Sequence, residues 1–327
     1  MSPERGIGWG ILGCGHIAGK FASDLALAPG SRLVASYGRD RDKSEAFTTR
    51  FGGTAHDDLG QFLSEPGIDV VYVATPHALH PRHVRTCLEA GLPVLCEKPF
   101  ALTRREAEPL LKLARSKGLF LMEALWTRFL PHVQASLEMV RSGLLGTPQL
   151  LTADFGFVGS KDPASRLNDP ALGGGTLWDI GIYPLFLALE WLGRPDTVKA
   201  LATRGPTGVD LRLSMSLGYS GGAMAHLLSS FLESTPTQAR LHGSAGSLAL
   251  ERMFHAPTDL VVLDREGDGK RMTFPKEGHG YQHEILHVNG CLRQGLPESP
   301  LWPHEKTLEL LSLMERVQEA AAQPPAM

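Results

Sequence analysis

The chain has 327 residues, of which 43% are hydrophobic and 20% are charged, and this length suits one large domain or two of ordinary size. The formal net charge of -3 gives no basic surplus for nucleic acid or anionic lipid, so neither is expected as a partner. No apolar run approaches the roughly 20 residues of a membrane span. The four cysteines lie far apart, as expected of reduced thiols in the cytoplasm.

Up to about residue 125, short apolar runs alternate with amphipathic segments of helix length, which is typical of a parallel sheet covered by helices on both faces. Two of the intervening helices are expected to end at Gly91 and Gly118. Residues 1–127 are therefore predicted to form a doubly wound Rossmann domain. Its strands are expected at 7–13, 32–38, 69–76, 93–99 and 119–126.

The pattern changes near residue 130. A helix at 131–143 is followed by longer strand-like segments that mostly lack helices between them, which favours an antiparallel sheet. An apolar helix at 178–192 interrupts this series, and two more helices complete the chain. Residues 128–327 are thus predicted to form an α+β domain, with strands at 149–158, 197–204, 209–219, 237–251 and 259–274 and final helices at about 280–294 and 304–321.

The first predicted strand runs into a glycine-rich loop, Gly13-Cys14-Gly15-His16-Ile17-Ala18, which is the G-x-G-x-x-A form of the dinucleotide-binding fingerprint. The first glycine makes the turn, the second lets the backbone approach a pyrophosphate, and the alanine lets the helix pack on the strand. Backbone amides at the helix start would face the phosphates. Because the loop also opens a βαβ unit, we expect it to bind a dinucleotide through Gly13, Gly15, His16 and Ile17; the alternative is only a tight turn.

The end of the second strand, SYGRDRDK, bears on the choice of nicotinamide cofactor. Gly38 occupies the place of the acidic residue that would hold a ribose 2'-hydroxyl, and Arg39 follows it. Arg39 and Lys43 could clamp a 2'-phosphate, although Asp40 could instead reach a ribose. We expect NADP, with NAD as a possibility. The alternative is that these cations, together with Arg41, form a solvated helix start.

A charged pair, Glu97 and Lys98, follows a predicted buried strand and precedes Pro99. Ligands of a doubly wound sheet bind beyond the carboxyl ends of its strands, and the proline keeps Lys98 extended. Lys98 is therefore either a site residue or an exposed lysine paired with Glu97, and the Lys98-Pro99 bond could be cis or trans. At the same level the neighbouring strand ends in residues expected near the nicotinamide, namely Ala74, Thr75, Pro76 and His80.

Asp179 and Tyr183 are four residues apart in the apolar segment 178–192, hence on one face of a helix. They either satisfy each other in the core or face a cleft. Trp126 and Phe155 are likewise either core residues or walls of a substrate cleft.

Three histidines, His279, His283 and His287, recur every four residues, with Glu284 off their stripe. A catalytic zinc site needs a third ligand and an open position, so we expect no metal.

Three segments carry a family resemblance: VLCEKPFAL (94–102), GLFLMEALWTRFLP (118–131) and GGGTLWDIGIYPL (173–185). Together they resemble the glucose-fructose oxidoreductase, inositol dehydrogenase and MocA family, and within it the branch of dimeric dihydrodiol dehydrogenases, which also oxidise D-xylose. The resemblance covers nearly the whole chain. It implies a second domain whose open sheet forms a homodimer or homotetramer. It also implies a catalytic lysine at Lys98, an acid/base tyrosine at Tyr183, a 2'-phosphate arginine at Arg39 and a residue near the cofactor at Arg128.

The sequence departs from this family at SYGRD, because relatives more often have alanine or serine in the place of Gly38.

Oxidation of an alcohol by hydride transfer needs a base for the hydroxyl proton, and a tyrosine with a pKa of about 10 needs a nearby cation to serve. Our hypothesis is that Tyr183 is the acid/base and Lys98 the cationic stabiliser, which could also hold the substrate oxygen directly. Asp179 would position the substrate hydroxyls or the lysine.

The predicted function is NADP-dependent oxidation or reduction of a small sugar, polyol or vicinal diol. Two alternatives come from other classes of protein: a dinucleotide-binding regulator without turnover, and a glycosidase that uses tightly held NAD. The substrate and the physiological direction stay open.

Overall fold

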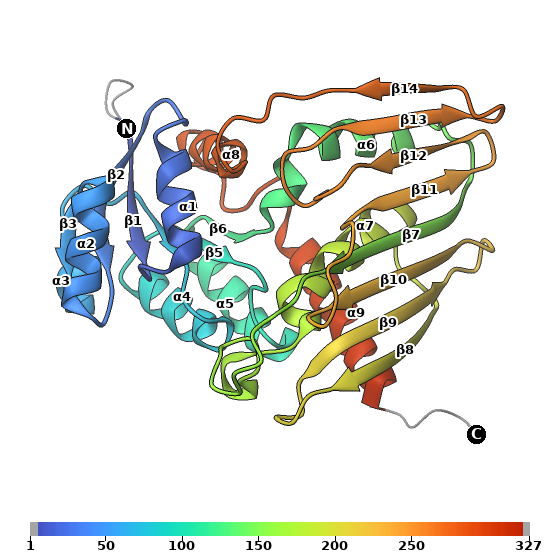
Figure 1. The fold of residues 1–327 in the computed structure, drawn as a ribbon. Helices are drawn as coiled ribbons and strands as arrows, with labels where there is room; N and C mark the ends of the chain where they lie inside the picture. Colours follow the sequence, from blue (N-terminus) through green and yellow to red (C-terminus); the bar gives the residue numbers. More distant parts are fainter. Residues whose placement is uncertain (1–5, 323–327) are drawn as a thin grey trace. The chain divides into compact units, whose positions relative to one another are not determined.

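The computed structural model describes residues 6–322 of the chain (Figure 1). These residues divide into two compact units. Unit 1 comprises the chain up to Phe129 together with Glu277–Leu308, and unit 2 comprises Leu130–Lys276 together with the chain from Glu309 onward.

Unit 1 is built on a six-stranded sheet in the order β3-β2-β1-β4-β5-β6, in which every pair of neighbours is parallel. This is the predicted doubly wound sheet. Four of its strands are buried along their whole length, which is why they appear in the sequence as continuous apolar runs. The strands are β1 (Ile7–Leu12), β2 (Ser31–Tyr37), β3 (Thr54–His56), β4 (Val70–Val73), β5 (Val94–Glu97) and β6 (Leu121–Ala124).

Capping residues mark the ends of helices in unit 1, as α5 shows. The hydroxyl of Thr103 accepts a hydrogen bond from the backbone N–H of Glu106 at the start of α5, and Gly118 ends that helix in the left-handed conformation at φ 63°. The elements are α1 (His16–Leu25), α2 (Arg41–Phe51), α3 (Leu59–Leu63), the short turn η1 (His77–Leu79), α4 (His80–Glu89), α5 (Arg104–Lys117), the turn η2 (Trp126–Phe129) and α8 (Tyr281–Arg293).

The place of α8 differs from the predicted division of the chain, which assigned everything after residue 127 to the second domain. Asp24, buried near the end of α1, accepts hydrogen bonds from the backbone N–H groups of His279 (2.8 and 2.9 Å) and Tyr281 (2.9 Å). These bonds fix the start of α8 on unit 1. Contacts between residues so far apart in the chain leave no periodic signal in the sequence.

Unit 2 contains an eight-stranded sheet in the order β14-β13-β12-β11-β7-β10-β9-β8. The pair β10–β7 is parallel and the other pairs are antiparallel, so the sheet is mostly antiparallel as predicted. The predicted strands at 237–251 and 259–274 are each a pair of strands, and β10 was not predicted. The strands are β7 (Pro148–Gly156), β8 (Thr197–Arg204), β9 (Asp210–Gly218), β10 (Met224–Ser230), β11 (Ala239–Gly243), β12 (Gly246–Leu250), β13 (Leu260–Asp264) and β14 (Gly269–Met272).

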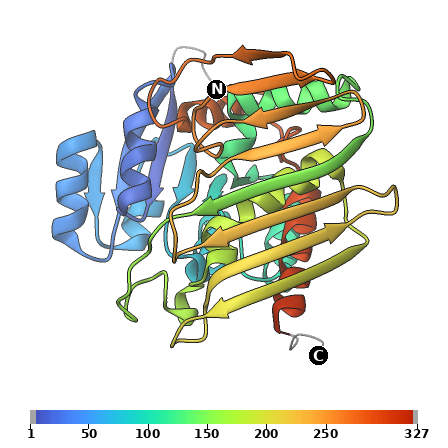
Figure 2. The ribbon, with the colours of Figure 1, turned by 45° about the vertical axis from the view of Figure 1, so that its right-hand side comes forward.

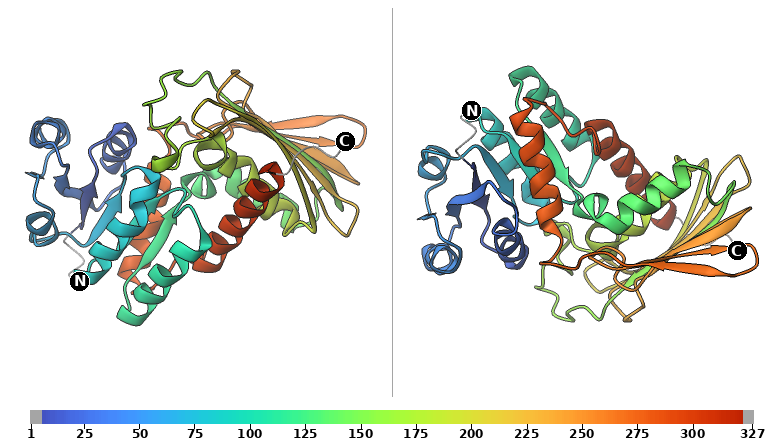
Figure 3. Two further views of the ribbon diagram at one scale, coloured as in Figure 1. Left: turned by 90° about the horizontal axis from the view of Figure 1, so that it is seen from below. Right: turned by 90° about the horizontal axis from the view of Figure 1, so that it is seen from above.

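One face of this sheet is covered by α6 (Pro131–Arg141), α7 (Ile182–Leu192) and α9 (His304–Ala322), as Figures 2 and 3 show. Its other face carries no helix within residues 6–322. The strand register aligns the side chains of Leu201, Ser214 and Leu228 on that open face, and Leu201 is 63% exposed. The open sheet predicted for this half of the chain is therefore present.

The helical stretch Pro170–Leu192 is long and apolar enough to span a membrane by length and composition alone, with a mean hydropathy of 1.3 in its most apolar window. However, 89% of that window is buried inside the fold. Core helices commonly meet the same criterion, and α7 is such a helix.

Candidate active site

The glycine-rich loop between β1 and α1 has the shape that its sequence predicts. Gly13 has φ 109°, and an added Cβ would lie 2.8 Å from the carbonyl oxygen of Ala74, so this position requires glycine. At Gly15, the N-cap of α1, an added Cβ would meet no described atom within 4 Å. Ala18 is fully buried. The first turn of α1 is thus open to an anionic ligand and carries no acidic side chain.

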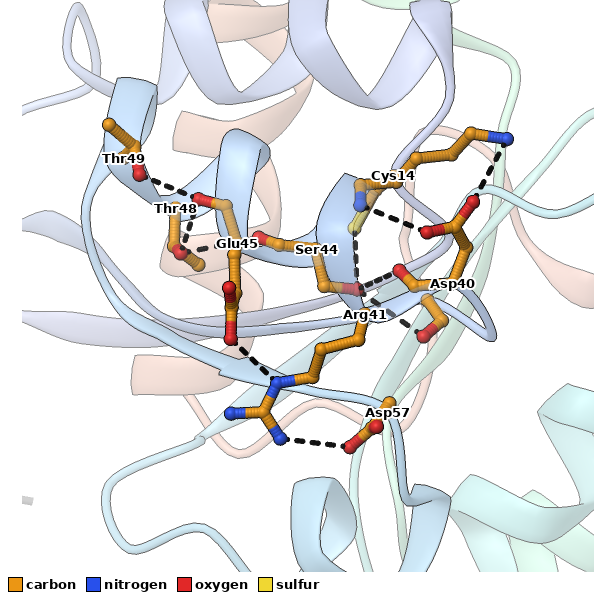
Figure 4. Close-up of polar contacts among 10 residues, drawn as sticks. Cys14, Asp40, Arg41, Ser44, Glu45, Thr48, Thr49 and Asp57 are labelled. Atoms are coloured by element: carbon orange, nitrogen blue, oxygen red, sulfur yellow. Dashed lines mark hydrogen bonds and ion pairs between the residues drawn. The ribbon is translucent and has the colours of Figure 1, made fainter.

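Gly38 closes the second strand, and its lack of a side chain has a packing reason. An added Cβ would lie 2.7 Å from Oγ of Ser44 and 3.5 Å from Sγ of Cys14. Cys14 and Ser44 are also in contact with each other (Figure 4). Ser44 in turn donates to the carbonyl oxygen of Gly38 at 3.3 Å. Any side chain at this position would require the Ser44 hydroxyl to shift, which gives a packing reason for glycine where relatives more often have alanine or serine.

The cations after Gly38 have different partners. Arg41 pairs with Glu45 (2.7 Å) and Asp57 (3.2 Å), so its charge is already balanced (Figure 4). Asp40 is the N-cap of α2: it accepts from the backbone N–H of Lys43 at 3.2 Å, which lowers the pKa of its carboxyl group, and also pairs with Nζ of Lys43 at 3.4 Å.

Arg39 differs from its neighbours. Its exposed side chain has no hydrogen bond or ion pair with any residue between 6 and 322. Its charge, after burial and the charge of Arg82, lowers the pKa of His83, whose Nδ1 lies 3.0 Å from Oγ1 of Thr75. Among the described residues Arg39 is therefore an unpaired cation directly after β2, the position at which a doubly wound domain binds a 2'-phosphate.

Lys98 lies at the carboxyl end of β5 in a braced turn. The Lys98-Pro99 bond is cis. Glu97 accepts a hydrogen bond from the backbone N–H of Lys98 at 3.1 Å and another from the hydroxyl of Tyr72. Beyond the proline, the backbone N–H of Phe100 donates to Glu123 at 2.9 Å. The backbone on both sides of the lysine is thus held by buried carboxyl groups, while its own side chain stays half-buried.

His80 holds this turn from the other side. It is fully buried, and its ring nitrogens lie 2.8 Å from the carbonyl oxygens of Pro99 and Thr75. Burial lowers the pKa of His80 to about 4, so the ring is neutral at pH 7 and donates to one of the two carbonyls. Neither nitrogen can reach a cofactor without breaking one of these contacts. His80 ties Thr75 to the Lys98 turn, a role different from the expected lining of the nicotinamide site.

In unit 2, the segment that carries Asp179 and Tyr183 is irregular, in contrast to the single helix that we predicted. Asp179 lies in a π-helical turn, η4 (Leu177–Gly181), and Tyr183 in the first turn of α7. The buried carboxylate of Asp210 accepts from the hydroxyl of Thr176 (2.6 Å) and from the backbone N–H of Leu177 (2.8 Å). Asp210 therefore fixes where this turn begins.

Both side chains are largely buried, and each has a neighbour in unit 2 that sequence reasoning missed. Nη1 of Arg166 donates to Oδ1 of Asp179 at 3.1 Å. The ring of His255 lies 5.2 Å from that of Tyr183 and 4.3 Å from that of Phe155, which itself packs on Tyr183 at 5.5 Å. Asp179 thus has an ionic neighbour, and Tyr183 has aromatic neighbours.

The remaining predicted residues lie in η2 of unit 1. Trp126 is buried and stacks on Tyr281 of α8, with ring centroids 4.6 Å apart. Arg128 is also buried, and its charge adds to the effect of burial in lowering the pKa of His287 to about 4. Within residues 6–322 no three histidine, cysteine or acidic side chains form a group that could hold a metal ion.

The chain matches two family models in succession. Residues 7–125 match the GFO/IDH/MocA model described as an oxidoreductase family with an NAD-binding Rossmann fold, and residues 133–249 match the GFO/IDH/MocA C-terminal domain. The trans-1,2-dihydrobenzene-1,2-diol dehydrogenase of Mus musculus is 35% identical over 325 residues, which cover 95% of this chain and 96% of that protein.

The chain belongs to the GFO/IDH/MocA oxidoreductase family.

Two solved structures of this family have the same fold as the present chain. KijD10, a 3-ketoreductase from Actinomadura kijaniata in complex with NADP and TDP-benzene, is 28% identical with a TM-score of 0.88. An aldose-aldose oxidoreductase from Caulobacter crescentus, complexed with glycerol, is 26% identical with a TM-score of 0.88. Each match covers 97% of this chain and 98% of the other. The Rossmann domain, the open sheet and the oxidoreductase class predicted from the sequence are thereby confirmed.

In this GFO/IDH/MocA chain, only some of the site residues that were not predicted leave a signal in the sequence. Glu123 interrupts the apolar run LFLMEALW, and Glu284 lies on the apolar side of a helix; a carboxyl group in such a place is a signal. Arg166 and His255 lie in irregular segments, where no periodicity reports their neighbours. That Lys98 and Tyr183 share one pocket stays a prediction, because they belong to different units.

Proposed function

We propose that this oxidoreductase transfers hydride between NADP and the hydroxyl-bearing or carbonyl carbon of a small sugar, polyol or vicinal diol. The names of its relatives support this substrate class, since they include a diol dehydrogenase, a 3-ketoreductase and an aldose-aldose oxidoreductase. The observation that carries the proposal is the braced turn at the end of β5, which presents Lys98 where a doubly wound sheet binds its ligands.

When bound, the nicotinamide would supply the hydride chemistry, and side chains of the protein would accept and return the proton. Tyr183 takes the proton of the substrate hydroxyl in oxidation and returns it in reduction. The ammonium group of Lys98 lowers the pKa of the phenol or stabilises the developing alkoxide. Asp179, held by Arg166, positions the neighbouring hydroxyl groups of the substrate. Trp126 and Phe155 serve as apolar walls for the carbon skeleton.

Preference for NADP is supported by the contrast between two arginines. Arg41 is neutralised by Glu45 and Asp57, whereas Arg39 has no such partner among the described residues. Because residue 38 is glycine, this position also lacks the acidic side chain that would favour the 2'-hydroxyl of NAD.

The decisive test is turnover of free cofactor with a panel of sugars, polyols and vicinal diols. The absorbance of the reduced nicotinamide measures this turnover. Substrate-dependent formation or consumption of NADPH is the expected result. Cofactor binding without turnover would instead indicate a regulator. Release of an aryl leaving group without net change in the cofactor would indicate a glycosidase.

We also infer a homodimer or homotetramer formed through the open face of the eight-stranded sheet. Support comes from the large apolar side chains on that side, Leu201 and Met224, which are 63% and 45% exposed. Leu201→Asp should dissociate the oligomer in analytical ultracentrifugation, whereas Leu27→Asp, at an exposed leucine of unit 1, should not. An unchanged mass for Leu201→Asp would oppose this interface.

A cytoplasmic location is a further proposal, and it is supported by the four cysteines, all of which are free thiols. Fractionation of the native cells tests it.

A further inference from the structure

Glu284 on α8 is a buried acid that the proposed mechanism does not use. Its side chain is fully buried, and neither carboxyl oxygen has a hydrogen-bond partner within residues 6–322. Burial of an ionised carboxylate without donors is very costly, because no group in the interior replaces its hydration. An acid in this position is expected to be neutral.

The groups coupled to Glu284 belong to unit 1, where Phe21 packs against both Tyr72 of β4 (ring centroids 3.7 Å apart) and Tyr281 of α8 (6.1 Å). Burial and, after it, the charge of Glu97 on β5 raise the pKa of Glu284, and Glu284 adds to the larger effect of burial in raising the pKa of Tyr72. Elsewhere on the same helix, Asp24 of α1 acts on His283, and Arg128 of η2 acts on His287. The titratable groups coupled to Glu284 are therefore Glu97 and Tyr72. Tyr281, on the same helix as Glu284, also contributes to raising the pKa of Tyr72.

Two neighbouring buried acids hold one negative charge more easily than two, so they share one proton. The contacts decide where this proton resides. Burial raises the pKa of Glu97, but the charge of Lys98 opposes this effect, as do the hydrogen bonds that Glu97 accepts from Tyr72 and from the backbone N–H of Lys98. Glu284 has none of these stabilising contacts. The proton therefore resides on Glu284, and the charge resides on Glu97.

Glu123 provides an internal comparison, because it is buried to a similar degree. It accepts three hydrogen bonds, from the backbone N–H of Phe100 (2.9 Å), the indole of Trp302 (3.1 Å) and the hydroxyl of Thr307 (2.9 Å). Burial raises the pKa of Glu123, and these donors oppose that effect by favouring the charged form. The two acids differ in hydrogen bonding and hardly in burial.

We propose that Glu284 is a positioning residue: a neutral carboxylic acid behind the Lys98 turn that allows Glu97 to stay ionised and to hold the backbone of Lys98. This role rests on the proposed function only in so far as Lys98 is catalytic. When Glu284 loses its proton, two adjacent carboxylates repel each other, and Glu97 no longer keeps Lys98 in place. Catalysis then declines at alkaline pH for a reason that lies outside the substrate pocket.

Infrared difference spectroscopy tests the protonation of Glu284 without any substrate. The intact protein at neutral pH should show the carbonyl stretch of a protonated, buried carboxyl group, and Glu284→Gln should remove it. Glu123→Gln is the matched control and should leave the band in place. A spectrum without this band in the unmodified protein, or one whose band survives Glu284→Gln, would overturn the proposal.

Stability against pH gives an independent test with a defined sign. A carboxyl group whose folded pKa is raised lowers the stability of the protein progressively as pH rises above its unfolded pKa of about 4.3. Glu284→Gln removes this loss, so its stability relative to the unmodified protein should increase with pH. A difference between the two proteins that does not change with pH would mean that Glu284 is charged and paired.

The link to Lys98 is tested by the pH profile of kcat. The alkaline decline of the unmodified protein should move to higher pH in Glu284→Gln; the same decline in both proteins would refute the positioning role. If Glu284→Gln does not fold, Glu97→Gln replaces it, and the infrared band of Glu284 should then disappear at lower pH than in the unmodified protein. Absence of turnover with every substrate would count against the proposed function and leave the infrared result intact.

Discussion

Arg166 donates a hydrogen bond to Asp179 across 3.1 Å, and this pair joins an irregular surface segment to the π-helical turn that begins the buried helix of unit 2. The side chain of Arg166 is 49% exposed and that of Asp179 is 11% exposed. The ion pair is therefore partly screened by solvent on the arginine side, whereas the carboxylate of Asp179 is almost fully enclosed.

Replacement of Arg166 by glutamine should raise KM for a polyhydroxylated substrate by no more than about fivefold, because partly exposed ion pairs contribute about 1 kcal/mol or less. Asp179→Asn should have a larger effect, since it removes the carboxylate that we propose contacts the substrate. Steady-state kinetics with the best substrate of the panel measures both variants. An equal or larger effect at Arg166 would mean that the arginine itself binds the substrate.

Cofactor preference should depend on one of the two arginines after β2. We expect NADP to bind at least about tenfold tighter than NAD, and Arg39→Ala to abolish this preference, because only Arg39 is free to pair with a 2'-phosphate among the described cations at this helix start. Arg41→Ala is the matched control and should preserve it. Dissociation constants from fluorescence titration provide the measurement; equal affinity of the intact protein for both cofactors would contradict the assignment.

Substitution of Lys98 or Tyr183 should reduce turnover and leave cofactor binding almost unchanged. Lys98→Met and Tyr183→Phe should each lower kcat by about 100-fold or more, the lower range for loss of general acid/base catalysis, while NADP affinity changes by a few-fold at most. Stopped-flow measurement of the hydride-transfer step distinguishes slow chemistry from slow product release. Full turnover in either variant would remove that residue from the mechanism.

Asp210 should matter for stability. Asp210→Ala leaves the hydroxyl of Thr176 and the backbone N–H of Leu177 without their acceptor in a buried place, and should lower the free energy of unfolding by about 1–3 kcal/mol. Asp210→Asn retains one acceptor oxygen and should lose less. Urea denaturation followed by circular dichroism gives both values, and equal losses would show that the charge, not the acceptor, is what this turn requires.

Much of unit 1 was predictable because its strands are short, parallel and buried. A strand such as β5 appears as an apolar run whatever lies around it, and the glycine loop and the helix end at Gly118 follow from backbone preferences of single residues. By contrast, β3 has three residues and α3 five, which is too short for any periodicity. In unit 2, β10 was not predicted, although its side chains alternate between exposed and buried over most of its length.

The candidate site was less predictable than the fold, for a physical reason. The role of a polar side chain is decided by its partners, and the partners of His80, Asp210 and Glu284 lie in other elements. Spacing suggested that Asp179 and Tyr183 share one face of a regular helix. The bonds from Thr176 and Leu177 to Asp210 instead accompany a π-turn there, which spacing alone does not report.

The attachment of α8 to the Rossmann unit has a consequence for how this protein can be divided. The polypeptide passes between its two units three times, after Phe129, after Lys276 and after Leu308. A single proteolytic cut near residue 129 would leave an amino-terminal fragment without the helix that covers Trp9, Phe21 and the buried carboxylate of Asp24. The nucleotide-binding half is thus not a self-sufficient module, and its completion must wait until most of the chain has been synthesised.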